Sequence, residues 1–173
     1  MPSVDLRLLR LAIGDHRREQ AATHIEPFSA SSLDYTSVPA DFDSELGITK
    51  LRDGILFDLD FETTVVGPCQ RCLGEARLEL AIDGREYQAD APTPDGDAET
   101  TPYLTGEVLD LDDWARDAVI LALPLVITCA SRCKGLCAQC GANLNVAACD
   151  CDGPPPDERW SVLRTIETDA RTT

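Results

Sequence analysis

The chain has 173 residues, of which 43% are hydrophobic, which is enough for one domain with a core or for such a domain plus a small module. Its 31 acidic residues against 15 lysines and arginines give a net charge of -16, which disfavours general binding to nucleic-acid phosphates and suits a basic protein partner. Such acidity also occurs where it serves only solubility, and no stretch is long and apolar enough to span a membrane.

The first 43 residues show little regular patterning. A stretch rich in leucine and arginine over residues 4–11 fits a short helix or strand, and a polar, serine-rich stretch follows around residues 29–32. The N-terminus lacks the apolar core and the small-residue cleavage site of a secretory signal, so we expect a cytoplasmic protein. We interpret residues 1–43 as a loosely attached arm, and its His16 and His24 as solvent-exposed side chains rather than metal ligands.

Strand patterns begin after residue 43. Apolar and polar residues alternate over residues 46–61 and again over 76–89, as in half-buried strands. An Asp-Gly pair at residues 53–54 is a hairpin signal, and a second pair stands at residues 83–84. We therefore expect an α+β fold with three or four antiparallel strands in a sheet or small open barrel, whose edge a metal holds at Cys69 and Cys72.

A helix is expected after an acidic, proline- and threonine-rich loop over residues 90–105. Apolar residues recur at three- and four-residue steps from Leu111 to Leu125, Asp110 gives a start signal, and Pro124 ends the pattern. We expect this helix to pack on the sheet, with Trp114 as a core anchor. Residues 44–128 would then form a β-rich body with one helix.

Residues 129–173 are expected to form a cysteine-rich, zinc-ribbon-like module followed by a final helix. The prolines at residues 154–156 cannot be helical, and Asp157 would open an amphipathic helix. Its apolar side consists of Trp160, Leu163 and Ile166. That side would dock on the body or present a face to a partner.

The eight cysteines divide into two sets of four. A Cys-x-x-Cys turn can place two sulfurs on one tetrahedral zinc ion, about 2.3 Å from it. One set is local and consists of Cys137, Cys140, Cys149 and Cys151, and the other joins distant segments and consists of Cys69, Cys72, Cys129 and Cys133. We expect Gly141 to allow close backbone approach to the sulfurs, and the basic residues Arg71, Arg132 and Lys134 to offset the thiolate charge. Two zinc ions per chain are predicted.

Other uses of the cysteines remain open. Four disulfides would require a secreted protein, and a redox role for Cys69 and Cys72 would require exposure that a sequence does not show. An enzyme is not expected, because we find no nucleophile with a His or Lys base and no phosphate-binding glycine loop. With every thiol used as a ligand, neither zinc ion would keep an open position for water.

Four motifs carry a resemblance to a known family. They are Cys-Gln-Arg-Cys-Leu at residues 69–73, Ile-Leu-Ala-Leu-Pro at 120–124, the run from Cys133 to Asn145, and the acidic-Arg-Trp start of the final helix. Over residues 46–166 the chain resembles the YceD family. That resemblance implies a bacterial protein, with plastid relatives, that is needed for accumulation of large-subunit ribosomal RNA, is often encoded beside a large-subunit ribosomal protein, and has no assigned reaction.

The resemblance also bears on the cysteine sets. Some family members keep the upstream Cys-x-x-Cys and one later Cys or His pair but lack the downstream cysteines. This implies that Cys69 and Cys72 belong with Cys129 and Cys133.

The function that we expect is that of a zinc-binding, non-catalytic accessory factor for large ribosomal subunit biogenesis. It would act through a basic ribosomal protein or an assembly intermediate of the large subunit. Two alternatives are a thiol and zinc redox sensor, and a zinc ribbon that contacts RNA directly through Arg71, Arg132 and Lys134.

Overall fold

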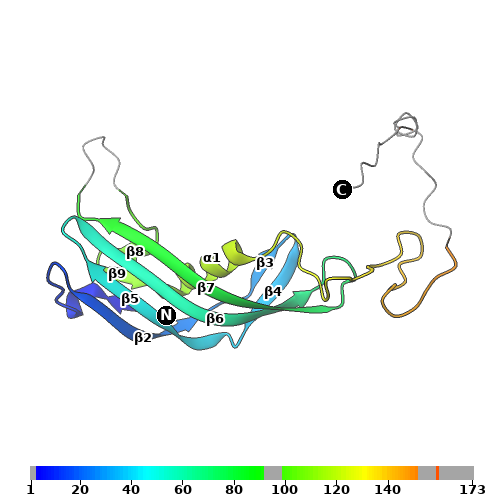
Figure 1. Cartoon of the computed structure of the whole chain (residues 1–173), viewed down its shortest axis with the longest axis horizontal. Helices are drawn as coiled ribbons and strands as arrows, with labels where there is room; N and C mark the ends of the chain where they lie inside the picture. The colour runs from blue at the N-terminus through cyan, green and yellow to red at the C-terminus, as the bar shows by residue number, and fades with distance from the viewer. Residues whose placement is uncertain (1–2, 92–98, 152–158, 160–173) are drawn as a thin grey trace, which may run out of the picture.

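The computed structural model describes residues 3–91, 99–151 and 159 of the chain (Figure 1). Over these residues the fold consists of two open antiparallel sheets and one α-helix, α1 (Leu111–Ala122). The larger sheet contains β2 (His16–His24), β5 (Asp41–Lys50), β6 (Gly54–Pro68), β4 (Leu33–Val38) and β3 (Phe28–Ala30) in that order, with β7 (Glu75–Ala89) also paired to β6. The smaller sheet has the order β1 (Ser3–Asp5), β9 (Val108–Asp110), β8 (Leu104–Thr105), and a short 3-10 helix, η1 (Leu6–Leu8), follows β1. The expected antiparallel sheet with a packed helix is confirmed, but the larger sheet has six strands where three or four were expected.

The hairpin of β6 and β7 is the longest feature of the sheet. Each strand has 15 residues, and they pair without interruption from Gly54 opposite Ala89 to Pro68 opposite Glu75. The other side of β6 is shared, because its first half pairs with β5 and its second half with β4. Residues 69–74 are therefore the turn at the far end of a long ribbon that other strands support.

The two Asp-Gly pairs have different roles. The first marks the predicted hairpin, with Asp53 in the connection between β5 and β6 and Gly54 as the first residue of β6. The second, at residues 83–84, makes no turn, because β7 runs straight through it. A Cβ on Gly84 would lie 3.4 Å from the indole nitrogen of Trp114, so a small residue lets the helix approach the sheet here.

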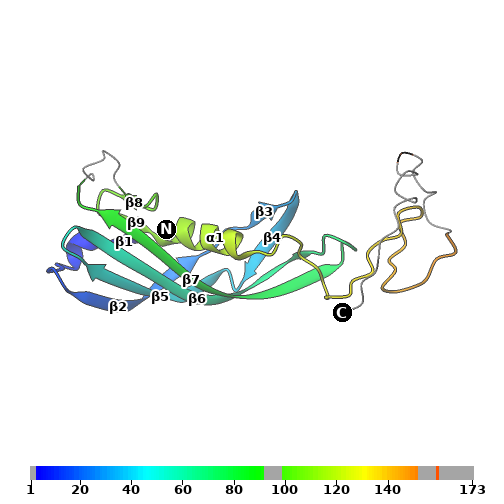
Figure 2. The same cartoon turned by 45° about the horizontal axis from the view of Figure 1, so that its top comes forward.

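The core lies between the inner face of the large sheet and α1. Trp114 is only 2% exposed, which confirms it as a core anchor, and the helix contacts β2 and β7. Asp110 caps the helix, because its carboxylate accepts hydrogen bonds from the backbone N–H groups of Asp112 and Asp113. Figure 2 shows α1 and the small sheet on the same face of the large sheet. Among the described residues, no helix covers the opposite face.

The N-terminal segment differs from the loosely attached arm that we expected over residues 1–43. It forms β1 to β4 and the beginning of β5, and the side chains of Ile25 and Tyr35 are buried in the core. Two of these strands, β2 and β4, pair with β5 and β6 rather than with the strand that follows them in sequence. The residues of such a strand do not identify its partner, so the sequence pattern of residues 1–43 alone is only a weak signal of strands in the sheet. The division of the chain into domains stays a prediction.

Two expectations fall partly or wholly outside the described residues. These are the centre of the acidic loop, residues 92–98, and the final helix with Trp160, Leu163 and Ile166. Within the described stretches of the chain, no helix has the length and apolar character needed to cross a membrane.

Candidate metal centres

The turn between β6 and β7 holds the first cysteine pair. The N–H of Cys69 donates to the carbonyl of Gly74 at 2.7 Å, and the N–H of Leu73 donates to the carbonyl of Cys69 at 2.9 Å. Leu73 has a φ of +58°, in the left-handed region that ends such tight turns. The turn therefore folds back on itself, with Cys69 and Cys72 both buried.

Tyr35 on β4 supports this turn from the N-terminal segment. Its hydroxyl donates to the carbonyl of Pro68 at 3.0 Å, directly before Cys69, and its ring lies where a Cβ of residue 67 would be. Gly67 is thus required for close packing of the ring on the strand. Sequence patterns do not reveal Tyr35 as a contributor to the site, because only the pairing of β4 with β6 brings it there.

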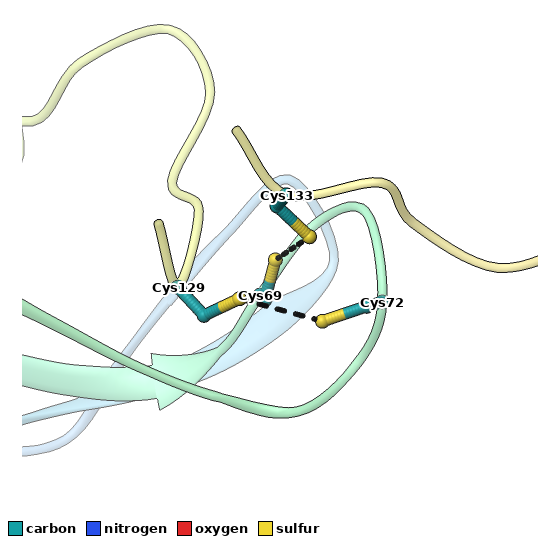
Figure 3. A group of neighbouring side chains, drawn as sticks. All are labelled: Cys69, Cys72, Cys129 and Cys133. Carbon is teal, nitrogen blue, oxygen red and sulfur yellow. Dashed lines mark hydrogen bonds between the residues drawn. The ribbon is translucent and has the colours of Figure 1, made fainter. Parts of the chain in front are cut away.

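The segment after α1 brings the second cysteine pair to the first. The N–H of Gln70 donates to the carbonyl of Ile127 at 2.9 Å, and the N–H of Ile127 donates to the side-chain oxygen of Gln70 at 3.2 Å. As a result the Sγ atoms of Cys72 and Cys129 lie 3.6 Å apart, and those of Cys69 and Cys133 lie 3.8 Å apart (Figure 3). We call Cys69, Cys72, Cys129 and Cys133 the first centre.

The second centre consists of Cys137, Cys140, Cys149 and Cys151. They belong to residues 137–151, the orange segment that lies beyond the end of the large sheet (Figure 1). The N–H of Cys137 donates to the carbonyl of Ala142 at 2.8 Å, and the N–H of Gly141 donates to the carbonyl of Cys137 at 2.9 Å. Gly141 has a φ of +74°, and nothing lies within 4 Å of its Cβ position. Glycine is needed here for its left-handed backbone, not for the close approach that we expected.

Both centres have the geometry of a four-thiolate metal site. In each, the four sulfurs lie within 4.8 Å of one another, and bonds of about 2.3 Å to a tetrahedral ion would place sulfurs about 3.8 Å apart. A disulfide would bring two sulfurs to about 2.05 Å, and all eight cysteines are free. Each group could therefore hold a metal ion. That these residues are metal ligands stays a prediction, although the structure gathers them in the two expected sets.

The thiols within each centre titrate unequally. Burial raises the pKa of Cys69, but backbone N–H donors, first that of Arg71 at 3.4 Å, outweigh it and lower the pKa to about 6. Hydrogen bonds to the thiols of Cys72 and Cys133 raise the pKa of Cys129 to about 12. Four thiolates so close together repel one another, so without a cation some of the thiols stay protonated.

The second centre repeats this pattern. The backbone N–H groups of Cys140 and Gln139 lower the pKa of Cys137 to about 6, whereas the hydrogen bond with the Cys140 thiol, together with burial, raises the pKa of Cys151 to about 12. A divalent cation would supply the positive charge that a full set of thiolates requires.

Two of the three basic residues expected near the sulfurs, Arg71 and Lys134, make backbone hydrogen bonds at the first centre. Arg71 donates its N–H to Cys69, and the N–H of Lys134 donates to the side-chain oxygen of Asn145 at 2.8 Å. Arg71, Arg132 and Lys134 are exposed. Asn145 itself contacts a sulfur of the first centre, a role that the spacing of the cysteines does not reveal.

Comparison with known proteins places this chain in a family. The model of the family described as large ribosomal RNA subunit accumulation protein YceD matches residues 57–167, a range that begins in β6, contains all eight cysteines and exceeds half of the chain. The chain belongs to the YceD family. The family description refers to accumulation of the large ribosomal RNA subunit and names no reaction. The resemblance drawn from the cysteine motifs is confirmed.

Curated relatives of this YceD chain include bacterial and plant proteins. An uncharacterized protein of Mycobacterium tuberculosis is 30% identical over 105 residues, which cover 59% of this chain and 51% of that protein. A chloroplastic YCED homolog of Arabidopsis thaliana, named a large ribosomal RNA subunit accumulation protein, is 40% identical over 58 residues, or 34% of this chain and 18% of that protein. The chain thus spans about half the length, or less, of these relatives. No solved structure matches it.

Proposed function

We propose that this YceD chain is a cytoplasmic, zinc-binding, non-catalytic accessory factor for biogenesis of the large ribosomal subunit, acting through a basic ribosomal protein. The observation that carries the proposal is the pair of four-sulfur centres in a chain whose family is described by large ribosomal RNA accumulation. An all-thiolate tetrahedral site suits zinc, and four protein ligands leave no position for a reacting water. Zinc would thus serve to hold the turn and the C-terminal segment in place.

The acidic outer face of the large sheet supports a basic partner. On this face Glu45 of β5 lies opposite Asp60 of β6, which in turn lies opposite Asp83 of β7, so that three carboxylates form a row across adjacent strands. Like charges directly opposite each other destabilise a sheet, and of these three carboxylates Arg18 pairs only with that of Glu45, at 2.7 Å. A partner rich in lysine or arginine would relieve the repulsion that is left. We call these three residues the carboxylate row.

Recovery of partners from lysate tests this proposal. The tagged chain is used to retrieve bound proteins with and without ribonuclease treatment. We expect a ribosomal protein to survive digestion and to bind the purified chain with an affinity that falls as salt rises. If every ribosomal protein disappears after digestion, the partner is RNA, and the proposal of a basic protein is wrong.

Charge-neutral variants then locate the surface. Replacing the carboxylate row by Glu45→Gln, Asp60→Asn and Asp83→Asn should weaken binding of that protein and reduce its salt dependence. A matched control removes three exposed carboxylates outside this row, with Glu26→Gln, Glu99→Gln and Glu107→Gln. Equal losses in the two triple variants would show that only net charge matters, and not this face.

A redox sensor is the second candidate. Each centre has one exposed cysteine, Cys129 in the first and Cys140 in the second. An exposed sulfur is the point at which an oxidant attacks a zinc thiolate site. Zinc release by mild peroxide, reversed by a thiol reductant and accompanied by new disulfides in mass spectra, would support this candidate over the purely structural use of zinc.

A further inference from the structure

The two centres are joined through one short segment. Cys133 belongs to the first centre and Cys137 to the second, and only residues 134–136 separate them. The N–H of Leu136 donates to the carbonyl of Arg71 at 3.0 Å, and a Cβ on Gly135 would lie 3.1 Å from the same oxygen. The base of the second centre thus packs directly on the turn that carries Cys69 and Cys72.

The loop of the second centre then returns to the first. Leu136 and Asn143 form an antiparallel bridge, and the N–H of Leu144 donates to the carbonyl of Gly135 at 3.0 Å. This pairing closes the loop that contains Cys137 and Cys140. It also places Asn145, the residue after Leu144, beside the segment that follows Cys133.

The side chain of Asn145 has a defined orientation there. Its oxygen accepts the N–H of Lys134 at 2.8 Å, and its amide nitrogen lies 2.9 Å from the side-chain oxygen of Asn143 and 3.3 Å from Sγ of Cys133. Because the oxygen is held by a backbone donor, the NH₂ group must face the sulfur. An amide that donates to a thiolate stabilises its negative charge and orients it toward a metal.

We propose that Asn145 couples the two centres, so that metal bound by the second centre strengthens metal binding by the first. Metal on Cys137, Cys140, Cys149 and Cys151 fixes the loop on both sides of Asn145. The fixed loop holds the Asn145 amide against the sulfur of Cys133. This coupling rests on the proposed use of both centres as metal sites.

Cadmium-113 NMR of the full chain tests the coupling, because each four-thiolate centre gives its own resonance. The Cys140→Ser variant alters the resonance of the second centre and so assigns it. The rate at which a chelator removes cadmium from the first centre is measured in each variant. Asn145→Asp replaces the donor by an acceptor and should speed this loss about tenfold. Asn143→Asp is the matched control, since it adds the same charge two residues away and keeps the oxygen that Asn145 contacts. Equal rates in the two variants would overturn the role of Asn145.

The second arm measures the coupling itself. Cys140→Ser should speed loss from the first centre in the otherwise unchanged chain, but not in a chain that already carries Asn145→Asp. The same acceleration in both backgrounds would mean that the connection runs through the backbone contacts at Leu136, and the proposal would be wrong. Absence of any cadmium resonance in the unaltered chain would instead refute the metal sites, and with them the proposed function.

Discussion

At the scale of single residues, Tyr35 connects the N-terminal strands to the first centre. Its buried ring rests on Gly67 and its hydroxyl donates to Pro68, one residue before Cys69. Tyr35→Phe keeps the ring and removes the hydrogen bond, so we expect the free energy of unfolding to fall by about 1 kcal/mol. Urea unfolding measures this fall in stability. In the same variant the turn should also release metal to a chelator faster. An unchanged unfolding midpoint would show that the hydroxyl does not contribute to stability.

Asp60 illustrates the energetic cost of the carboxylate row. Burial raises its pKa above the usual value, Asp83, Glu45 and Asp58 raise it further, and Arg18 offsets only a portion of the rise. A raised pKa favours the protonated acid in the folded state, so this contribution to stability is present at low pH and is lost as pH rises through the folded pKa. Asp60→Asn should therefore stabilise the protein by about 0.5 kcal/mol at pH 7 and give no gain near pH 3. Urea unfolding at the two pH values measures the gain in stability. An equal gain at both pH values would contradict an electrostatic origin.

At the scale of structural elements, the two centres restrain very different lengths of chain. The first links the β6–β7 turn to residues after α1, and its Cys69 and Cys133 are 64 residues apart. The second closes a loop from Cys137 to Cys151 that lies beyond the sheet. Constraining a long loop lowers the entropy of the unfolded chain more than constraining a short one. The stability of the β-rich body should therefore depend on the first centre.

Serine substitutions separate these roles. Cys72→Ser should destabilise the β-rich body by about 4 kcal/mol, the loop-closure entropy expected for a cross-link over a loop of this size. Cys137→Ser should leave unfolding of the body nearly unchanged and loosen only the C-terminal segment. Amide hydrogen exchange in β6 and β7 distinguishes the two outcomes. If both variants lower protection of these strands equally, the second centre belongs to the body.

At the scale of the whole molecule, the number of bound metal ions is the most direct check on both centres. We expect two zinc ions per chain in protein kept reduced and away from chelators, because eight thiols complete two tetrahedral sets. Elemental analysis measures this ratio. One ion per chain would leave only one centre as a metal site, and none would refute both.

The affinity for zinc should also rise with pH. In the metal-free protein the pKa values of Cys129 and Cys151 are raised to about 12, so binding must displace protons from both centres at neutral pH. The apparent affinity should therefore fall at least about tenfold for each pH unit below 7. Competition with a chelator of known pH dependence measures it, and a flat profile would argue against thiolate ligands.

Features encoded over a few residues were determined by the sequence itself. The hairpin between β5 and β6 and the helix start at Asp110 depend on local backbone preferences, so their signals lie within four or five neighbouring residues. The division of the cysteines into two sets also followed from spacing and family resemblance, because a Cys-x-x-Cys turn constrains its own sulfurs.

Contacts between distant segments were decided only by the tertiary structure. The N-terminal strands, the support of the β6–β7 turn by Tyr35 and the carboxylate row all depend on strand register, which pairs residues far apart in the chain. A shift of register by one residue would turn each side chain to the opposite face, and the pattern of one strand does not specify its partner. The contact of Asn145 with Cys133 likewise exists only because the loop of the second centre folds back on the first.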